Sequence, residues 1–359
     1  MTPYVVLFAI LVFYGIYEIS RKPIMAVPKG MVNNYRSKNF YLIIPVIVIL
    51  IMGIFRETTV GYDSETYYKY YWICIDDFSW PYLFTHFSID NGFYIVLKLI
   101  AIFTRDWWLA RAILFVITFL LYYYFITEYS PYPIMSLIIV LGLALLGLMF
   151  SILRQALAGA ITLFAYKYVH RNKGINSIIF ILLAATIHKS ALVCLYIILL
   201  YKLKLKKFFG FKLLLYSVIV GIIFTIVVPI IIKLYADSRY EGIAAHNGGY
   251  GMLLFMITVT ILILLLFEIT NKKQDLEMGF IFNISCGAIF LQIGALIWEL
   301  LNRITIYFSF YWCLLIPMLI YKLPKNWRIA YYIIVVVLFG FMFFYQISEV
   351  DKFILHQFY

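Results

Sequence analysis

The stretch Leu42–Ile54 reads LIIPVIVILIMGI and contains no charged side chain. A second stretch, Ser217–Ile232, reads SVIVGIIFTIVVPIII and is equally free of charge. Both are apolar on every side, whereas a half-buried strand would alternate apolar with polar residues, so both predict helices in apolar surroundings. Apolar runs of about 17 to 22 residues recur along the chain, and a helix of this length crosses roughly 30 Å of hydrocarbon. We therefore expect an all-α, polytopic integral membrane protein.

The composition supports this class. Of the 359 residues, 65% are hydrophobic and 13% are charged, against roughly 25% charged in ordinary soluble domains. The net charge of +12 does not indicate a nucleic-acid partner, because the basic residues form short clusters between apolar runs and there set topology and contact anionic lipid. The four cysteines are widely separated, which predicts neither a disulfide framework nor a metal site. The lipid bilayer is thus the first partner that the sequence indicates.

Clusters of basic residues set the orientation. Seventeen of the 29 Lys and Arg residues lie in five stretches, which the positive-inside rule assigns to the cytoplasm: Arg21–Lys38, Arg171–Lys173, Lys202–Lys212, Lys272–Lys273 and Lys322–Arg328. The acidic stretch 56–91 follows a span that leaves the first basic loop, so we expect it to be an outer loop. The stretch 235–250 is outer by the same counting.

One apolar run cannot span under this topology. Four runs lie between the outer loop and the basic turn at Arg171, yet the chain must cross an odd number of times. The run Gly92–Phe103 is the weakest, because about 12 residues make only about 18 Å of helix, and Lys98 interrupts it. We expect it to be re-entrant or interfacial, with Ile175–Tyr201 forming a hairpin that reaches the outer face at His188. In the alternative, Gly92–Phe103 spans and Ile175–Tyr201 is one helix, but the basic turn is then exported.

The preferred count gives about 12 transmembrane helices, with both termini on the outer side. No repeat or linker divides the chain, so residues 1–359 are expected to form a single transmembrane domain.

Several charges remain that topology does not explain. Arg56 ends a predicted span, Arg154 and Arg303 open spans, and His188 stands at the hairpin tip, so all four map to the outer side. A cation at membrane depth costs about 2.5 to 3.5 kcal/mol on insertion scales, so a group of them requires a partner or a ligand. Guanidinium groups bind phosphate oxygens in a bidentate fork, and the helix N-terminus after Ser151 adds N–H donors. The pattern therefore favours a phosphate or pyrophosphate ligand.

Each of these residues also has an ordinary structural explanation. Arg154 could extend to the membrane interface, and Glu299 could neutralise Arg303 one helical turn away. His188 could belong to a polar turn, and Asp63 could form a turn or cap a helix. If each residue had only its own structural explanation, these residues should be distributed over both faces of the membrane. Their common location on the outer side therefore favours a site.

Three segments carry a family resemblance: FRETTVGYD at 55–63 with Tyr67, LRQALA at 153–158, and IHKSAL at 187–192. In this order they resemble the Wzy-type polysaccharide polymerases, and most closely the EpsG-like branch. The motifs cover roughly residues 40–200, followed by Asn302-Arg303. The resemblance implies a multi-pass glycosyltransferase of the bacterial cytoplasmic membrane. Such an enzyme moves a growing glycan from undecaprenyl pyrophosphate to a lipid-linked repeat unit at the outer face, without a metal or other cofactor and with a chain-length regulator as a further possible partner.

On this basis we assign roles to the candidate residues. Arg154 and Arg303, with Arg56, are expected to bind the pyrophosphate, and His188 or Asp63 to accept the proton of the acceptor hydroxyl. His188 is slightly preferred as the base because its unperturbed pKa, about 6.5, needs less tuning. The residues expected to contact or orient sugars are Glu65, Tyr67, Gln155, Glu299 and Arg239.

Two other function classes stay open. A flippase or transporter for the same lipid-linked sugars predicts charges near the bilayer midplane and symmetry between the two halves. An O-antigen ligase predicts a larger outer loop in the second half than residues 235–250 provide.

Overall fold

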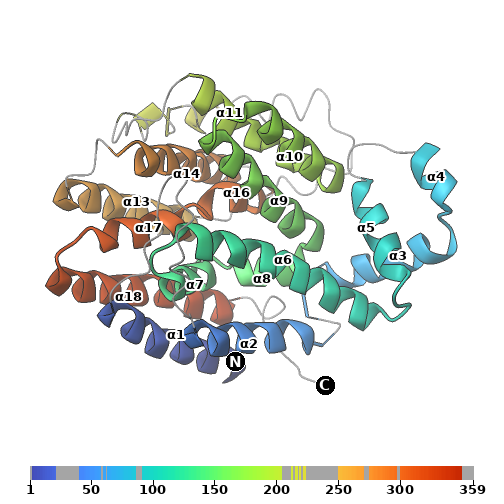
Figure 1. Ribbon diagram of the computed structural model, residues 1–359, viewed down its shortest axis with the longest axis horizontal. Helices are drawn as coiled ribbons and strands as arrows, with labels where there is room; N and C mark the ends of the chain where they lie inside the picture. Colours follow the sequence, from blue (N-terminus) through green and yellow to red (C-terminus); the bar gives the residue numbers. More distant parts are fainter. Residues whose placement is uncertain are drawn as a thin grey trace. The chain divides into compact units, whose positions relative to one another are not determined.

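The computed structural model describes residues 2–21, 40–57, 60–61, 63–85, 91–203, 212, 215–216, 218–219, 221–223, 250–270, 275–296 and 300–349. All of the elements in these residues are helices (Figure 1). They are α1 (Thr2–Ser20), α2 (Phe40–Ile54), α3 (Ser64–Asp76), α4 (Trp80–Thr85), α5 (Gly92–Ala101), α6 (Trp107–Tyr129), α7 (Pro133–Gly142), α8 (Leu145–Ser151), α9 (Leu153–His170), α10 (Gly174–Ile187), the 3-10 helix η1 (Lys189–Cys194), α11 (Leu195–Lys202), α13 (Tyr250–Thr270), α14 (Leu276–Ala295), α15 (Leu300–Ile304), α16 (Ile306–Ser309), α17 (Trp312–Tyr321) and α18 (Lys325–Glu349).

Six stretches of helix among the described residues are long and apolar enough to cross a membrane: Pro3–Ser20, Trp107–Tyr129, Tyr250–Thr270, Leu276–Ala295, Leu301–Tyr321 and Lys325–Ile347. The bent pair of α7 and α8 makes a seventh if it counts as one span. Three further apolar helices are shorter, namely α2, α5 and α10. The prediction of an all-α, polytopic membrane protein is confirmed, while the number of spans and their orientation stay predictions.

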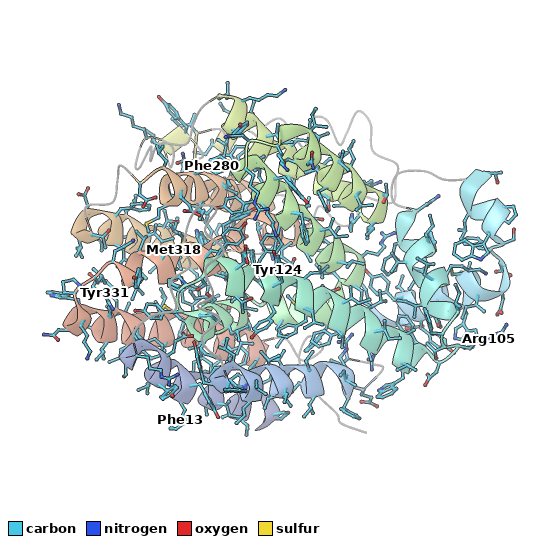
Figure 2. The ribbon with its side chains drawn as sticks, in the orientation of Figure 1. Phe13, Arg105, Tyr124, Phe280, Met318 and Tyr331 are labelled. Carbon is cyan, nitrogen blue, oxygen red and sulfur yellow. The ribbon has the colours of Figure 1, made fainter. Side chains whose placement is uncertain are left out.

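Large apolar side chains cover the outside of several of these helices. Phe13 on α1 is 70% exposed and points away from the other helices (Figure 2). Phe341 on α18 is 68% exposed. By contrast, Phe280 on α14 and Met318 on α17 are buried. Water does not tolerate so much exposed apolar surface, so these outer faces are suited to lipid.

The chain forms two compact units. The first comprises Met1–Leu195 and Lys325–Tyr359, and the second comprises Tyr196–Pro324. In the second unit, Asp275 caps α14 by accepting the backbone N–H groups of Glu277 and Met278. Most residues of α14 are buried, and a Cβ on its Gly287 would lie 3.0 Å from Phe308 of α16. This close approach makes α14 the centre of the second unit.

In the first unit, one buried carboxylate joins three helices. Glu18, near the end of α1, accepts the backbone N–H groups of Ile134 and Met135 at 3.0 and 3.2 Å. It also accepts the hydroxyl of Tyr41 at 3.1 Å. A carboxylate is favourable at a helix N-terminus, because the first N–H groups have no partner within the helix. Glu18 therefore fixes the start of α7 against α1 and α2.

The pair of α7 and α8, whose start Glu18 holds, is bent in its middle. The axes of α7 and α8 differ by 62°, and Ala144 between them has a positive φ of 57°. Gly142 ends α7 against α18, where a Cβ would lie 2.6 Å from the Phe339 carbonyl oxygen. The chain then turns through α8 and Ile152 into α9, so α9 begins deep in the first unit.

The predicted outer loop 56–91 and the short run after it also contain helices. Lys98 of α5 donates to the carbonyls of Cys74 and Ile75 at 2.9 and 3.2 Å, which caps the last turn of α3. Tyr71 of α3 donates to the carbonyl of Thr104 at 2.6 Å. Lys98 therefore does not interrupt α5 but binds it to α3. The helix α5 is 10 residues long, and whether it is re-entrant stays a prediction.

Candidate functional site

Arg56 follows the end of α2 and is completely buried. Its Nη1 donates to the carbonyl of Gly53 at 3.3 Å. The guanidinium carbon lies 4.6 Å from the ring centre of Phe150 and 5.5 Å from that of Phe115. Its Nε and Nη2 have no hydrogen-bond partner among the described residues. Aromatic faces compensate a buried cation only in part, so Arg56 carries positive charge that the described chain does not neutralise.

A second buried guanidinium holds the backbone at Arg56. Arg111, on the second turn of α6, donates to the carbonyls of Arg56 and Glu57. The two guanidinium groups repel each other. Because Arg111 binds two successive carbonyls, it fixes the start of the segment that leads from α2 to α3. The sequence analysis gave Arg111 no role, although a charge inside a long apolar helix is itself a signal.

The same segment ends in close contact with α8. Gly61 has a φ of +115°, and a Cβ at this position would lie 2.5 Å from the carbonyl oxygen of Phe150. Ser64 starts α3 and donates to the carbonyl of Val60 at 2.8 Å. The hydroxyl of Ser151, next to Phe150, is buried and has no partner among the described residues. Gly61 is thus required for two reasons: its positive φ favours glycine, and a side chain at this position would collide with the carbonyl oxygen of Phe150.

Asp63 occupies the N-cap position of α3, but its side chain does not accept a hydrogen bond from the first turn. It is half-buried. Asp63 therefore stands at the N-cap position without making the cap hydrogen bond, so helix capping alone does not explain this residue.

Tyr67 connects α3 to the start of α9. Its phenol oxygen accepts the backbone N–H of Arg154 at 3.4 Å, and its ring lies 5.7 Å from that of Phe93 on α5. Arg154 itself is half-buried, whereas Gln155 and Tyr67 are buried. The Arg154 side chain is therefore partly exposed, and Tyr67 holds the backbone from which it extends.

The hairpin of α9 and α10 brings His188 to the same end as Arg154. The two helices are joined by a short turn in which Asn172 has a φ of 60°. Ser177 of α10 donates to the carbonyl of Ala165 on α9 at 2.8 Å. Arg154 lies 11 residues before Ala165 and His188 lies 11 residues after Ser177. Two antiparallel helices rise equally per residue, so this register places His188 beside the first turn of α9.

At His188 the helix breaks. Its backbone is extended, with φ −150° and ψ 115°, and η1 follows directly. The imidazole Nδ1 accepts the backbone N–H of Ser190 at 3.3 Å and lies 3.3 Å from the Ser190 hydroxyl. The ring is half-buried. His188 thus caps η1 with its Nδ1.

The helix α5 lies between α3 and α10 (Figure 1). Phe93 in its first turn contacts Tyr67 on α3. A Cβ on Gly92 would lie 2.5 Å from the hydroxyl and 2.7 Å from the carbonyl oxygen of Thr186, two residues before His188. The short helix therefore separates the start of α3, which carries Asp63, from the end of α10.

The remaining predicted site residues are not part of this group. Glu65 is 83% exposed and pairs with Lys69 at 3.1 Å. Arg303 is half-buried on α15 in the second unit, and Arg239 and Glu299 lie outside the described residues. Among the first-unit candidates, contacts and register connect the segments of Arg56, Asp63, Tyr67, Arg154 and His188.

Metal chemistry and a Cys74 nucleophile find no support in the described residues. They contain no group of three or more His, Cys, Asp or Glu residues that could hold a metal ion. Burial raises the pKa of the Cys74 thiol to about 11, although nearby Lys98 acts in the opposite direction. At neutral pH this thiol is protonated and is a poor nucleophile.

A family model described as the EpsG family matches residues 38–359. Neither a curated protein nor a solved structure matches the chain. The likeness that three motifs indicated over residues 40–200 therefore extends over most of the chain, while kinship with the Wzy polymerases stays a prediction.

Proposed function

Because the chain belongs to the EpsG family, which is linked to exopolysaccharide biosynthesis, we propose that it is a polysaccharide polymerase. It transfers a growing glycan from undecaprenyl pyrophosphate to a lipid-linked repeat unit at the outer face of the bacterial cytoplasmic membrane. Two observations support this proposal: Tyr67, one turn after Asp63, accepts the backbone N–H of Arg154, and the hydrogen bond from Ser177 to Ala165 sets a register in which His188 lies near the first turn of α9. In the proposed site, a cation that can bind phosphate therefore lies near two groups that can handle a proton.

The proposed topology keeps about 12 spans, with both termini outside. The spans beyond the six long apolar helices are α2, the bent pair of α7 and α8, α9, α10, the pair of η1 and α11, and the apolar run around residues 217–232, which lies largely outside the described residues. In this topology, segments 56–91 and 235–250 are outer loops, α5 does not cross, and the chain acts as one transmembrane domain.

In the proposed reaction, Arg154 and Arg303 bind the donor pyrophosphate and stabilise the negative charge that develops as it leaves the anomeric carbon. Arg56 is completely buried, so it contributes its charge from behind the site in this conformation. Glu65, Arg239 and Glu299 are proposed to contact sugars, whereas buried Tyr67 and Gln155 support the start of α9. Either Asp63 or His188 accepts the proton of the attacking hydroxyl.

Deleting the gene tests the function class. A host that makes single repeats in place of long ladders supports a polymerase. A host that makes no surface glycan indicates a flippase, and unattached long polymer indicates a ligase.

The variant Arg154→Ala tests the site. We expect it to abolish polymer in the deletion strain, because the loss of one charge-stabilising group typically costs about 100-fold to 1000-fold in rate. The matched control is Lys167→Ala on the same helix, whose side chain lies at the other end of α9 against Tyr124. Both proteins must be present in the membrane at wild-type amounts. Wild-type chain length with Arg154→Ala would exclude this arginine from the reaction.

A further inference from the structure

A line of aromatic rings leads from the start of α9 to the surface of the first unit. This aromatic ladder consists of the rings of Tyr67, Tyr70, Tyr94, Phe78 and Tyr82. We propose that the aromatic ladder binds the growing glycan, with successive sugars packed along the rings. The proposal rests on the proposed function and deepens it, because it names where the donor chain is held beyond the reaction centre.

The ladder is continuous from ring to ring. The ring centre of Tyr67 lies 6.3 Å from that of Tyr70, its neighbour on α3. Tyr70 lies 5.8 Å from Tyr94 on α5. Phe78, just after α3, lies 5.4 Å from Tyr94 and 5.0 Å from Tyr82 on α4. All four separations are typical of aromatic pairs in contact, so the rings join α3, α5 and α4 (Figure 1).

The two ends of the ladder differ in exposure. Tyr67 is buried, the next three rings are half-buried, and Tyr82 is 43% exposed. At the buried end, the phenol oxygen of Tyr67 accepts the backbone N–H of Arg154. The ladder therefore begins at the backbone of the proposed pyrophosphate ligand and ends at the protein surface.

Charged side chains on the same helix indicate that this surface faces water. Glu65 and Lys69 of α3 are 83% and 66% exposed and pair at 3.1 Å. Asp76 and Asp77 at the end of α3 are exposed as well. Hydrocarbon strongly disfavours such charges, so the exposed part of the ladder differs from lipid-facing side chains such as Phe13. Exposed aromatic surface in water is suited to a ligand.

A glycan matches both the rings and the charges. The C–H groups of a sugar pack on an aromatic ring, and its hydroxyl groups can donate to carboxylates. Tyrosine provides a rigid apolar face together with a hydroxyl group. The ring centres are 5.0 to 6.3 Å apart, which is similar to the length of one sugar residue in an extended chain. An anionic lipid surface would instead be repelled by Asp76 and Asp77.

The buried end of the ladder indicates which glycan is bound. The first sugar of the donor is attached to the pyrophosphate, which Arg154 is proposed to bind. A ladder that begins at Tyr67 is therefore placed to hold the sugars that follow in the donor. Each transfer moves the growing chain to a new lipid carrier, so contacts with its sugars keep the chain at the enzyme for the next transfer. We therefore expect the ladder to influence polymer length.

Four substitutions test the ladder. Tyr82→Leu keeps an apolar side chain and removes the exposed ring, whereas Tyr82→Phe keeps the ring. Phe78→Leu removes an inner ring and is the second test variant. The matched control is Tyr68→Leu, because Tyr68 on α3 is 47% exposed but packs against Trp72 instead of the ladder. The variants are compared at equal membrane amounts and matched unfolding temperatures.

Binding is measured without catalysis. The probe is the host's own surface glycan, cut into fragments of one repeat and of several repeats and added to the purified protein in detergent micelles. We expect Tyr82→Leu and Phe78→Leu to raise the Kd for long fragments about 3-fold to 10-fold, the effect of one lost ring contact. The Kd for a single repeat should rise less. Tyr82→Phe and Tyr68→Leu should bind long fragments as wild type does.

Polymer length is measured in the deletion strain, where Tyr82→Leu should give shorter polymer than Tyr68→Leu. Equal effects of these two variants would overturn the inference and indicate general aromatic contact with the membrane interface. Wild-type Kd and length in both Tyr82→Leu and Phe78→Leu would also overturn it. A loss of affinity confined to the single repeat would overturn it in favour of an acceptor site.

The inference and the proposed function fail separately. If Arg154→Ala forms normal polymer, or if gene deletion gives the flippase or ligase result, the proposed function or its site is wrong. If Arg154→Ala is inactive while the ring variants bind and polymerise as wild type, only the aromatic ladder is wrong.

Discussion

Arg56 and Arg111 lie next to each other, and both are completely buried, yet replacing each with methionine should change stability in opposite directions. Methionine keeps an unbranched apolar stem and removes the guanidinium. The difference follows from what each guanidinium binds. Arg111 satisfies two backbone carbonyls, whereas Arg56 makes one long hydrogen bond to Gly53.

For Arg56→Met, two unpaired donors disappear from the interior. Each buried, unsatisfied donor costs about 1 to 3 kcal/mol. The variant loses the ring contacts with Phe150 and Phe115, worth about 1 to 2 kcal/mol, and one weak hydrogen bond of about 1 kcal/mol. The net expectation is a stabilisation of about 1 to 2 kcal/mol, within the range seen when buried charges are replaced by apolar groups.

For Arg111→Met, the carbonyls of Arg56 and Glu57 lose a charged donor. Hydrogen bonds to charged groups contribute about 1.5 to 3 kcal/mol each. The variant should therefore be destabilised by about 3 kcal/mol or more. Because Arg111 donates to the backbone carbonyl of Arg56 and both side chains are completely buried, each variant is the control for the other.

The measurement is thermal unfolding of the purified variants in the same detergent, followed by intrinsic fluorescence of the seven tryptophans. Arg56→Met should unfold about 2 °C or more above wild type, and Arg111→Met should unfold several degrees below it. In the deletion strain, Arg56→Met should nevertheless lose polymer. Comparable destabilisation by both variants would show that Arg56 is satisfied in the protein, and wild-type polymer with a stabilised Arg56→Met would show that its charge has no function.

Two further outcomes follow from the same end of the first unit. Gly92→Ala must push α5 away from Thr186 and should lower kcat about 10-fold to 100-fold through displacement of His188. The control is Gly174→Ala, where nothing lies within 4 Å of the added Cβ, and it should keep wild-type activity. Equal rates of the two variants would show that α5 does not position the site. We expect His188→Cys to react with a membrane-impermeant maleimide added outside intact cells, because the proposed topology places His188 at the outer face. The four native cysteines are buried, so they should add little background. Labelling that requires broken cells would place this end in the cytoplasm.

The fold class was predictable because hydrophobicity alone separates membrane helices from other structure. Leu42–Ile54 lies within the apolar helix α2, as expected. The break between α7 and α8 was not predictable, because glycine is frequent in membrane helices, so Gly142 and Gly147 beside Ala144 do not by themselves mark where the helix bends. The break occurs where Gly142 meets Phe339, which is a contact between residues far apart in the sequence.

The site was predictable in part for a similar reason. Arg154 and His188 belong to one short hairpin, so local periodicity is sufficient to place them at one end. The burial of Arg56 depends on Phe115 and Phe150, which come from distant segments, and no pattern near Arg56 signals it. Lys98 shows the same limit, because its partner carbonyls at the end of α3 are visible only after α3 and α5 pack together.

The treatment of buried charge within the first unit gives one reason to place function at the Arg56 end. Glu18 accepts hydrogen bonds from two backbone N–H groups and a hydroxyl, and Lys98 donates to two carbonyls, so packing gives each of these groups two or more partners. Arg56 donates to one carbonyl, and its Nε and Nη2 have no partner among the described residues. A chain selected only for stability would remove this charge, since a methionine should fit better. The proposed function would account for this cost, because an anionic donor would then approach the start of α9, and the stability and polymer assays on Arg56→Met measure both sides of that compromise.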